Sequence, residues 1–315
     1  MRYLNQWLNA KLAAILIAIF LAPTLLFAQP ENNDPSTEED VQQEAEDAQR
    51  ALDLFLRDQK LLYKKGEFSF EFSAFYSTSI QDTVWQDKNT NNIFLAKNIH
   101  RALNTSFTTR YGLMDGLELN INLPYGYAEQ KIESIGGSTR YNKTDGQGLR
   151  DIRVGLKYQF LYEDNGKPDL IADISYQAPT GDAPLLGSDH NHIEIGATFV
   201  KTVDPVVFFG RIGYKWTEEE KNHDPSDEIA FHGGLGLSLN DRVSVNLQSL
   251  GTLVMREKRK VNGKQIQSEI SEILSLQVSV TAIISKQLSL EPVVGFGLTD
   301  NATDSYVGVN IPYRF

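Results

Sequence analysis

The ten residues from Glu67 to Tyr76 read EFSFEFSAFY and alternate between two kinds of side chain, with one exception. One set is aromatic or small and apolar, and the other is glutamate or serine except at Phe75. Successive side chains of a β-strand point to opposite faces, so this stretch predicts a strand with one apolar and one polar face. The same period recurs to the last residues, Ser305 to Phe315, which read SYVGVNIPYRF with Tyr313 and Phe315 on the apolar side.

The alternation predicts twelve strands, at about 67–79, 97–112, 117–128, 148–162, 168–178, 190–203, 206–217, 227–239, 242–256, 268–285, 287–298 and 304–315. Short connections such as Asp164-Asn165-Gly166-Lys167 and Lys286-Gln287 alternate with longer, more polar ones. The longer ones are 80–96, 129–147, 179–189, 218–226, 257–267 and 299–303.

Short periplasmic turns, long extracellular loops and an even strand number are typical of bacterial outer-membrane barrels. We therefore predict an all-β fold, a 12-stranded antiparallel transmembrane β-barrel over 67–315 in the bacterial outer membrane, with both termini periplasmic. A secreted β-sandwich is the alternative, although its loop lengths need not alternate. Pro292 lacks a ladder donor, so a bulge is expected there.

The N-terminal residues predict export. Arg2 and Lys11 precede an apolar run that ends at Ala28, the order of a secretory signal peptide over 1–28. A retained membrane helix is the alternative reading. Loss of the two cations lowers the formal net charge from −11 to −13, which argues against nucleic acid as a partner. The chain has no cysteine, so disulfides and cysteine-based sites are excluded.

Two segments separate the signal from the barrel. The polar, acidic residues 29–39 predict a disordered linker. Residues 40–62 then place apolar side chains at helical spacing and predict a short amphipathic helix, either a plug in the barrel or part of a coiled coil between identical chains. Its candidate plug residues are Leu52, Phe55 and Leu56.

The polar faces of the predicted strands carry both signs of charge in near balance, so the interior is expected to select weakly between ions or to be partly closed by ion pairs. The candidate lumen-lining residues are Glu71, Arg110, Glu118, Arg153, Lys157, Asp173, Glu194, Arg211, Lys215, Arg242 and Glu291. The apolar faces end in aromatic residues that predict two girdles at the lipid interfaces, namely Tyr76, Tyr125, Tyr176 and Trp216 at one level and Tyr111, Tyr162 and Tyr313 at the other.

No cofactor and no enzymatic activity are expected, because none of the five histidines lies beside a nucleophile motif. His190 and His192 stand at alternate positions, which leaves a metal site as a weaker reading. The basic hairpin from Arg256 to Glu269 suggests contact with lipopolysaccharide phosphates, with a solvated charge run as the plainer alternative.

Three segments resemble a known family: FTTRYGLMDGLELNINLPYGY (Phe107 to Tyr127), GLRDIRVGLKYQFL (Gly148 to Leu161) and YQAPTGD (Tyr176 to Asp182). They look like the outer-membrane barrels grouped as phenol-degradation meta-pathway (MetA-like) proteins, often described as transporters. The stretch FLRDQKLLYKKGEFSFEFSAFYS (Phe55 to Ser77), with the helix before it, is also similar to the channel of functional-amyloid (Fap-type) secretion systems.

The first resemblance implies a channel for passive movement of small, hydrophobic or aromatic molecules, narrowed by the N-terminal helix. The second implies an export channel for an amyloid or adhesin polypeptide, and a closed structural barrel or an outer-membrane enzyme is a third hypothesis. Expected partners are outer-membrane lipid and lipopolysaccharide, the transported solute or polypeptide, and further copies of the chain. A terminal aromatic such as Phe315 also resembles the signal that the barrel-insertion machinery reads.

Overall fold

The structure is a computed structural model, and it describes residues 62–315 except 87–92, 135–140, 165, 183–184, 204–205, 220–222, 241 and 262–263. The predicted signal peptide, linker and helix, with Leu52, Phe55 and Leu56, lie outside these residues. Within the described part of the chain, no helix has the length and apolar character needed to cross a membrane.

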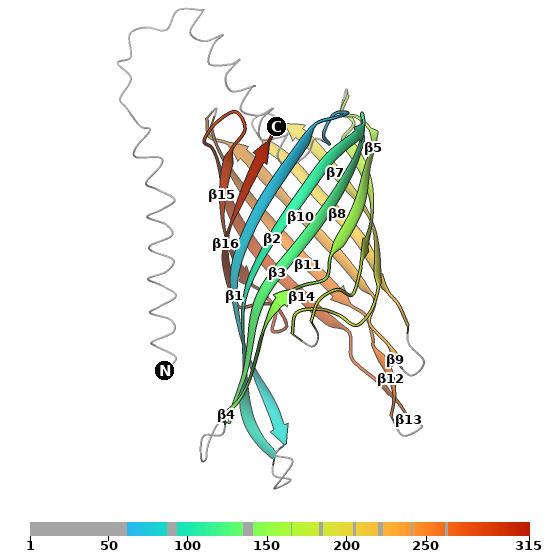
Figure 1. The fold of residues 1–315 in the computed structure, drawn as a ribbon, viewed down its shortest axis with the longest axis vertical. Helices are drawn as coiled ribbons and strands as arrows, with labels where there is room; N and C mark the ends of the chain where they lie inside the picture. The colour runs from blue at the N-terminus through green and yellow to red at the C-terminus, as the bar shows by residue number, and fades with distance from the viewer. Residues whose placement is uncertain are drawn as a thin grey trace, which may run out of the picture. The chain divides into compact units, whose positions relative to one another are not determined.

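One sheet closes on itself to form the predicted antiparallel barrel of twelve strands (Figure 1). The ring closes where β1 pairs with β16, from Ser69 opposite Arg314 to Thr78 opposite Ser305. In order around the ring, the strands are β1 (Phe68–Gln86), β2 (Ile93–Met114), β3 (Leu117–Ser134), β5 (Arg153–Leu161), β6 (Asp169–Gln177), β7 (His192–Val203), β8 (Val206–Thr217), β10 (Glu228–Ser238), β11 (Val243–Val254), β14 (Ser271–Ile283), β15 (Ser289–Gly297) and β16 (Ser305–Arg314).

The predicted strand at 148–162 consists of two pieces. Strand β4 (Tyr141–Leu149) pairs with the later half of β3, and β5 pairs with the first half of β3. The ladder is therefore interrupted between Leu149 and Arg153, and this gap in the wall has consequences for the interior.

The faces of the barrel are inverted relative to those of a water-soluble protein. Large apolar side chains point outward, where Phe107 is 57% exposed and Ile195 54% exposed, whereas the polar Asn246 and Ser279 on the inner face are almost fully buried. In a closed ring every strand pairs with two neighbours, so no row of backbone N–H and C=O groups is left without partners in the lipid. The arrangement is therefore suited to the apolar interior of a membrane. The period-two pattern of the sequence thus determines which side chains face the interior of the barrel and which face outward.

Three strands are longer than predicted. β1, β2 and β3 have 19, 22 and 18 residues, whereas spanning a bilayer takes about 9–11. The predicted loops 80–96 and 129–147 were therefore wrong in large part, because most of these residues belong to β1 to β4, which project together in Figure 1. Outside the apolar layer both faces of a ribbon meet water, so apolar alternation disappears although backbone pairing continues.

A second, small sheet lies beyond the barrel strands. It consists of β9 (His223–Asp224), β12 (Lys258–Val261) and β13 (Lys264–Gln267). Lys258 Nζ lies 3.0 Å from Asp224 Oδ2, and this hydrogen bond raises the pKa of the lysine. Arg259 lies 3.1 Å from Glu257. Part of the basic hairpin is thus paired within the protein, which weakens the predicted role in binding phosphates.

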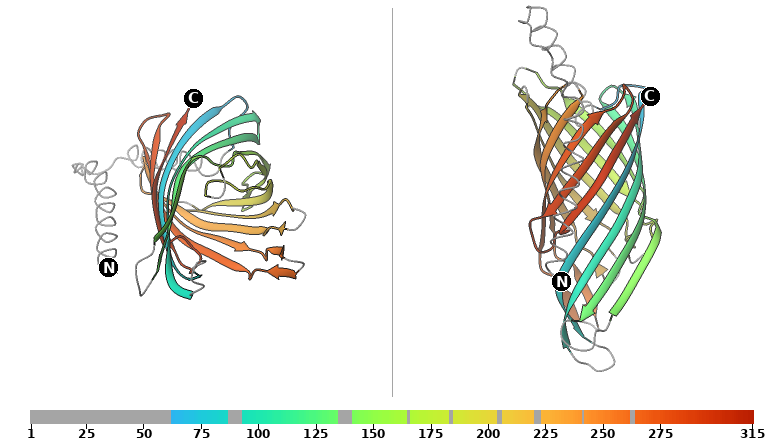
Figure 2. Two further views of the ribbon diagram at one scale, coloured as in Figure 1. Left: turned by 60° about the horizontal axis from the view of Figure 1, so that its bottom comes forward. Right: turned by 90° about the vertical axis from the view of Figure 1, so that its left-hand side faces the viewer.

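The two ends of the barrel differ. The termini end, as we call it, carries the start of β1, the end of β16 and tight turns such as the one at Gly116, whose φ of 77° favours glycine. There the backbone N–H of Phe315 donates to the carbonyl of Phe68 at 3.1 Å. The longer connections gather at the opposite end, the loop end (Figure 2).

The expected bulge at Pro292 is wrong. Pro292 pairs with Val309 in β16, and the flanking pairs to β14, Ser279 with Val293 and Ala282 with Leu290, keep one register. The strand therefore accommodates the missing N–H by omitting pairs beside the proline rather than by inserting a residue.

Candidate functional site

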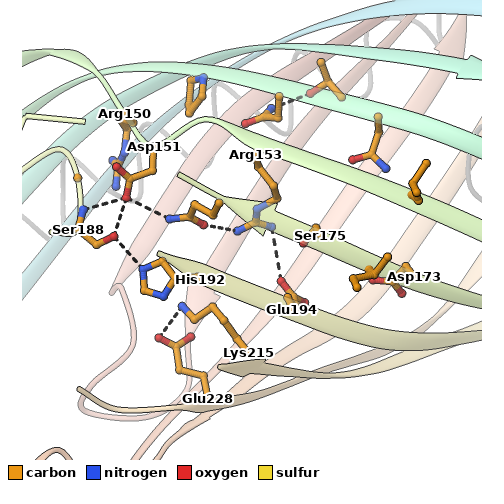
Figure 3. Close-up of a pocket in the computed structure, with 18 of the residues that line it drawn as sticks. Arg150, Asp151, Arg153, Asp173, Ser175, Ser188, His192, Glu194, Lys215 and Glu228 are labelled. Atoms are coloured by element: carbon orange, nitrogen blue, oxygen red, sulfur yellow. Dashed lines mark hydrogen bonds and ion pairs between the residues drawn. The ribbon is translucent and has the colours of Figure 1, made fainter. Parts of the chain in front are cut away.

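The barrel interior holds a cavity of about 960 Å³ whose lining is dominated by charged, amide and hydroxyl side chains (Figure 3). These side chains come from β2, β3, β5, β6, β7, β8 and β10, from the connection between β4 and β5, and from the connection between β6 and β7. The cavity lies against one part of the wall, where most of the predicted lumen-lining residues stand.

Arg110 on β2 and Glu118 on β3 form a bidentate ion pair. Arg110 donates from Nε to Glu118 Oε1 at 2.8 Å and from Nη2 to Oε2 at 2.9 Å. The Glu118 side chain is fully buried and also accepts the backbone N–H of Tyr63 at 3.2 Å. Such a fork is among the strongest side-chain pairings, and loss of one partner would leave the other charge buried and unpaired.

Arg211 on β8 reaches across two strands. It donates from Nη2 to Asp173 Oδ1 on β6 at 2.5 Å and from Nε to Oδ2 at 3.1 Å, and Nη2 also lies 2.7 Å from Glu194 Oε1 on β7. This reach requires a glycine, because a Cβ on Gly196 would lie 2.5 Å from Nη2. A guanidinium thus lies flat over the wall between two carboxylates.

Two further pairs extend the band (Figure 3). Arg153 donates to Gln177 Oε1 at 2.9 Å and lies 3.7 Å from Glu194, and Lys215 lies 2.7 Å from Glu228. Together with Lys157, which also lines the cavity, these residues form a charged band along the inner wall.

The other three predicted lumen residues, Glu71, Arg242 and Glu291, do not line the cavity. Glu291 on β15 accepts from Ser279 at 2.6 Å and from Asn310 at 3.0 Å. Glu71 on β1 accepts from Ser73 at 3.3 Å. Arg242 precedes β11 in the turn at the termini end, where its backbone N–H donates to Asn240 Oδ1 at 2.9 Å.

The connection between β6 and β7, residues 178–191, folds into the barrel, and we call it the inward loop. Leu186, 2% exposed, packs on Ala102 and Ala128, which face each other on the inner side of β2 and β3. The loop can be followed inside the ring of strands in Figure 2. An apolar tip therefore rests on the inner wall and narrows the lumen.

Asp151, in the gap between β4 and β5, anchors this loop. Its carboxylate accepts hydrogen bonds from the backbone N–H of Gly181 at 2.9 Å, from the N–H and hydroxyl of Ser188 at 2.8 Å each, and from Gln177 at 3.1 Å. The interrupted ladder thus places a carboxylate where four donors converge, two of them backbone groups of the loop.

Ser188 also contacts His192, with 2.8 Å between Oγ and Nε2. The other ring nitrogen of His192, Nδ1, lies 3.0 Å from Thr217 Oγ1. In a hydrolase triad the carboxylate holds the imidazole, but here Asp151 binds the serine itself. The geometry is that of a loop anchor.

The weaker reading of His190 and His192 as a metal site gains nothing from the structure. Across the described ranges, no three histidine, cysteine or acidic side chains form a set that could hold a metal ion.

Sequence reasoning missed the inward loop, which was assigned to the exterior as residues 179–189. Two signals were present. The apolar pair Leu185-Leu186 interrupts an otherwise polar connection, and small residues such as Ala102 and Ala128 occupy positions on the polar face of neighbouring strands. Small side chains on an inner wall leave room for another segment to pack.

Tyr63 closes part of the termini end. It is 8% exposed, and its ring lies under the guanidinium of Arg110, 4.7 Å from the centroid, with Arg314 at 5.8 Å. Burial raises the pKa of its hydroxyl. Gly112 permits this approach, since a Cβ there would lie 2.0 Å from the carbonyl oxygen of Lys64. The chain thus places an aromatic ring in the mouth of the barrel before β1 begins.

The predicted girdle residues all lie on outward faces and are between 38% and 56% exposed: Tyr76, Tyr111, Tyr125, Tyr162, Tyr176, Trp216 and Tyr313. Phe315 stacks on neighbouring rings at the termini end, with centroids 4.9 Å from Tyr313 and 5.6 Å from Phe68. Its role as an insertion signal stays a prediction.

A solved outer-membrane barrel shares this architecture, and two others give lower TM-scores. An outer membrane channel from Pseudomonas putida F1 superposes with a TM-score of 0.61 at 14% identity, covering 82% of this chain and 98% of that one. The translocator domain of the autotransporter NalP from Neisseria meningitidis gives 0.49 at 12% identity, covering 88% and 98%. The toluene transporter TodX of P. putida gives 0.41 at 8% identity, covering 80% and 90%. At these identities the first match shows the fold alone.

A family profile matches far more of the sequence than the three segments noted above. Residues 64–315 match the family described as "Putative MetA-pathway of phenol degradation". The match begins just after Tyr63 and covers the whole barrel.

Proposed function

Because this chain belongs to the family described as "Putative MetA-pathway of phenol degradation", we propose that it is an outer-membrane channel for passive movement of small solutes, aromatic ones included. The family description supplies the aromatic class of solute. No observation on the described residues favours export of a polypeptide over passage of small molecules.

The observation that carries the proposal is a closed barrel around a polar cavity of about 960 Å³. A barrel of twelve strands is wider than a barrel of eight strands, in which side chains fill the interior. Here ion pairs hold the charged side chains against the wall, and the inward loop fills only part of the lumen. This arrangement suits slow passage of small solutes rather than free diffusion of large ones.

We further propose that the termini end faces the periplasm and the loop end faces outward, since short turns are periplasmic in such barrels. The girdle of Tyr76, Tyr125, Tyr176 and Trp216 and the paired basic hairpin then lie at the outer leaflet, and the girdle of Tyr111, Tyr162 and Tyr313 lies at the periplasmic interface. A cysteine placed at Asn262, between β12 and β13, should react with an impermeant maleimide on intact cells. Labelling only after cell lysis would reverse the orientation.

Solute flux tests the channel directly. Proteoliposomes carrying the mature chain should swell in neutral sugars and small aromatic amides, and a chain lacking Glu39 to Leu62 should swell faster if the predicted helix narrows the lumen. Equal swelling rates of the two proteins would show that the predicted helix does not narrow the lumen. If neither folded protein passes any solute, the channel proposal fails.

A further inference from the structure

Lys157 holds an unusual position in the charged band. It lies on the inner face of β5, and the register places it directly between Glu118 on β3 and Asp173 on β6. Its side chain lines the cavity. Two carboxylates as nearest cross-strand neighbours would ordinarily give a lysine its partners.

Both carboxylates, however, are already bound by arginines. Arg110 takes both oxygens of Glu118, and Arg211 takes both oxygens of Asp173. Among the residues that the structure describes, no carboxylate oxygen lies within 4.0 Å of Lys157 Nζ, and its ammonium makes no hydrogen bond. The contrast is Lys215 in the same cavity, which lies 2.7 Å from Glu228.

The charges of the lining confirm the imbalance. The cavity is lined by five cations, Arg150, Arg153, Lys157, Arg211 and Lys215, and by four carboxylates, Asp151, Asp173, Glu194 and Glu228. One positive charge is therefore in excess. Burying an ammonium group without a hydrogen-bonding partner costs free energy unless a water molecule or an anion binds it.

Neutral polar side chains line the same cavity. Asn120 on β3 and Ser175 on β6 both lie opposite Gly155, two residues before Lys157, and Asn122 on β3 donates to Thr108 at 2.8 Å. Amide and hydroxyl groups beside an ammonium are the donors that complete recognition of a carboxylate. We propose that Lys157 is the binding site for the carboxylate of a small organic acid in transit through the lumen, an inference that rests on the proposed channel function.

The neighbouring acids restrict the ligand to a monoanion. The carboxylates of Asp173 and Glu194 line the same cavity and would repel a second negative charge on the ligand. Their own pairing with Arg211 prevents them from closing on Lys157. The site thus binds one carboxylate loosely enough to release it, as passage requires.

Calorimetric titration of the detergent-solubilised mature chain tests the site. Benzoate and benzamide are matched in shape and differ in charge, so benzoate should bind and benzamide should bind more weakly. Lys157→Gln should weaken benzoate binding by about tenfold or more, the loss expected for one charge-assisted hydrogen bond. Lys157→Arg should retain most of the affinity.

Lys215→Gln is the matched control, because it removes the same charge from the same cavity at a paired position. Benzoate affinity should change less than about twofold in this variant. Equal weakening by the two substitutions would show a general field effect rather than a site and would overturn the proposal, as would unchanged binding in Lys157→Gln.

The titration does not depend on conduction, so the two proposals can fail separately. Swelling in neutral solutes without Lys157-dependent binding of benzoate would leave a channel with no acid site. If benzoate binding depends on Lys157 but the barrel passes no solute, the binding site is supported and the channel proposal is rejected.

Discussion

The barrel receives two insertions into its lumen, and they are held in opposite ways. Tyr63, at the termini end, rests on the buried pair of Arg110 and Glu118. The inward loop, at the loop end, is held by neutral donors that converge on Asp151 and by Leu186 on two alanines. The first anchor pairs two opposite charges that are withdrawn from water, whereas the second joins one buried carboxylate to neutral donors and adds a small apolar contact.

The difference assigns each insertion a role. Breaking a buried ion pair costs far more than releasing a few hydrogen bonds, so the termini end is the rigid part of the lumen. We expect the inward loop, rather than Tyr63, to be the element that can leave the lumen while the barrel stays folded. We therefore regard the loop as the feature that sets the width of the passage.

The largest effect should come from Glu118→Ala. This change leaves the Arg110 guanidinium buried without its ion-pair partner and should lower the free energy of unfolding by about 3–5 kcal/mol. Urea unfolding of the barrel in detergent, followed by tryptophan fluorescence, measures it. Glu272→Ala, at an exposed position on β14, is the control and should leave the unfolding midpoint near that of the wild type. A Glu118→Ala barrel of unchanged stability would abolish the contrast between the two anchors.

A smaller loss is expected for Asp151→Ala, about 1–3 kcal/mol, because the freed donors of Gly181 and Ser188 can turn to water in the lumen. The sharper readout is proteolysis, since a released loop should be cut within 178–191 while the barrel resists. Asp189→Ala removes an exposed carboxylate from the same loop and should leave it protected. Greater instability in Asp151→Ala than in Glu118→Ala would invert the comparison.

The sequence predicted the barrel well because one physical pattern decides it. Alternation along strands such as Glu67 to Tyr76 shows which side chains face the interior and which face the lipid. The lengths of the connections distinguish the two ends of the barrel. The same criterion failed at residues 80–96 and 129–147, where the strands leave the apolar layer and lose the pattern but keep their pairing.

The candidate site was only partly predictable. Parity predicted that residues such as Arg110, Glu118 and Arg211 lie on the inner faces, and in the structure Arg110 pairs with Glu118 and Arg211 with Asp173. It could not show that the arginines capture both carboxylates beside Lys157, because that depends on side-chain reach across neighbouring strands. Nor could it show that a break at Asp151 draws the inward loop into the lumen.

Single-channel conductance in planar bilayers tests the central claim most directly, with the wild type, Asp151→Ala and Asp189→Ala compared in the same potassium chloride solution. If the inward loop sets the width, Asp151→Ala should conduct several times more current than the other two, which should match each other. Equal conductance in all three correctly inserted barrels would show that the loop does not control the passage.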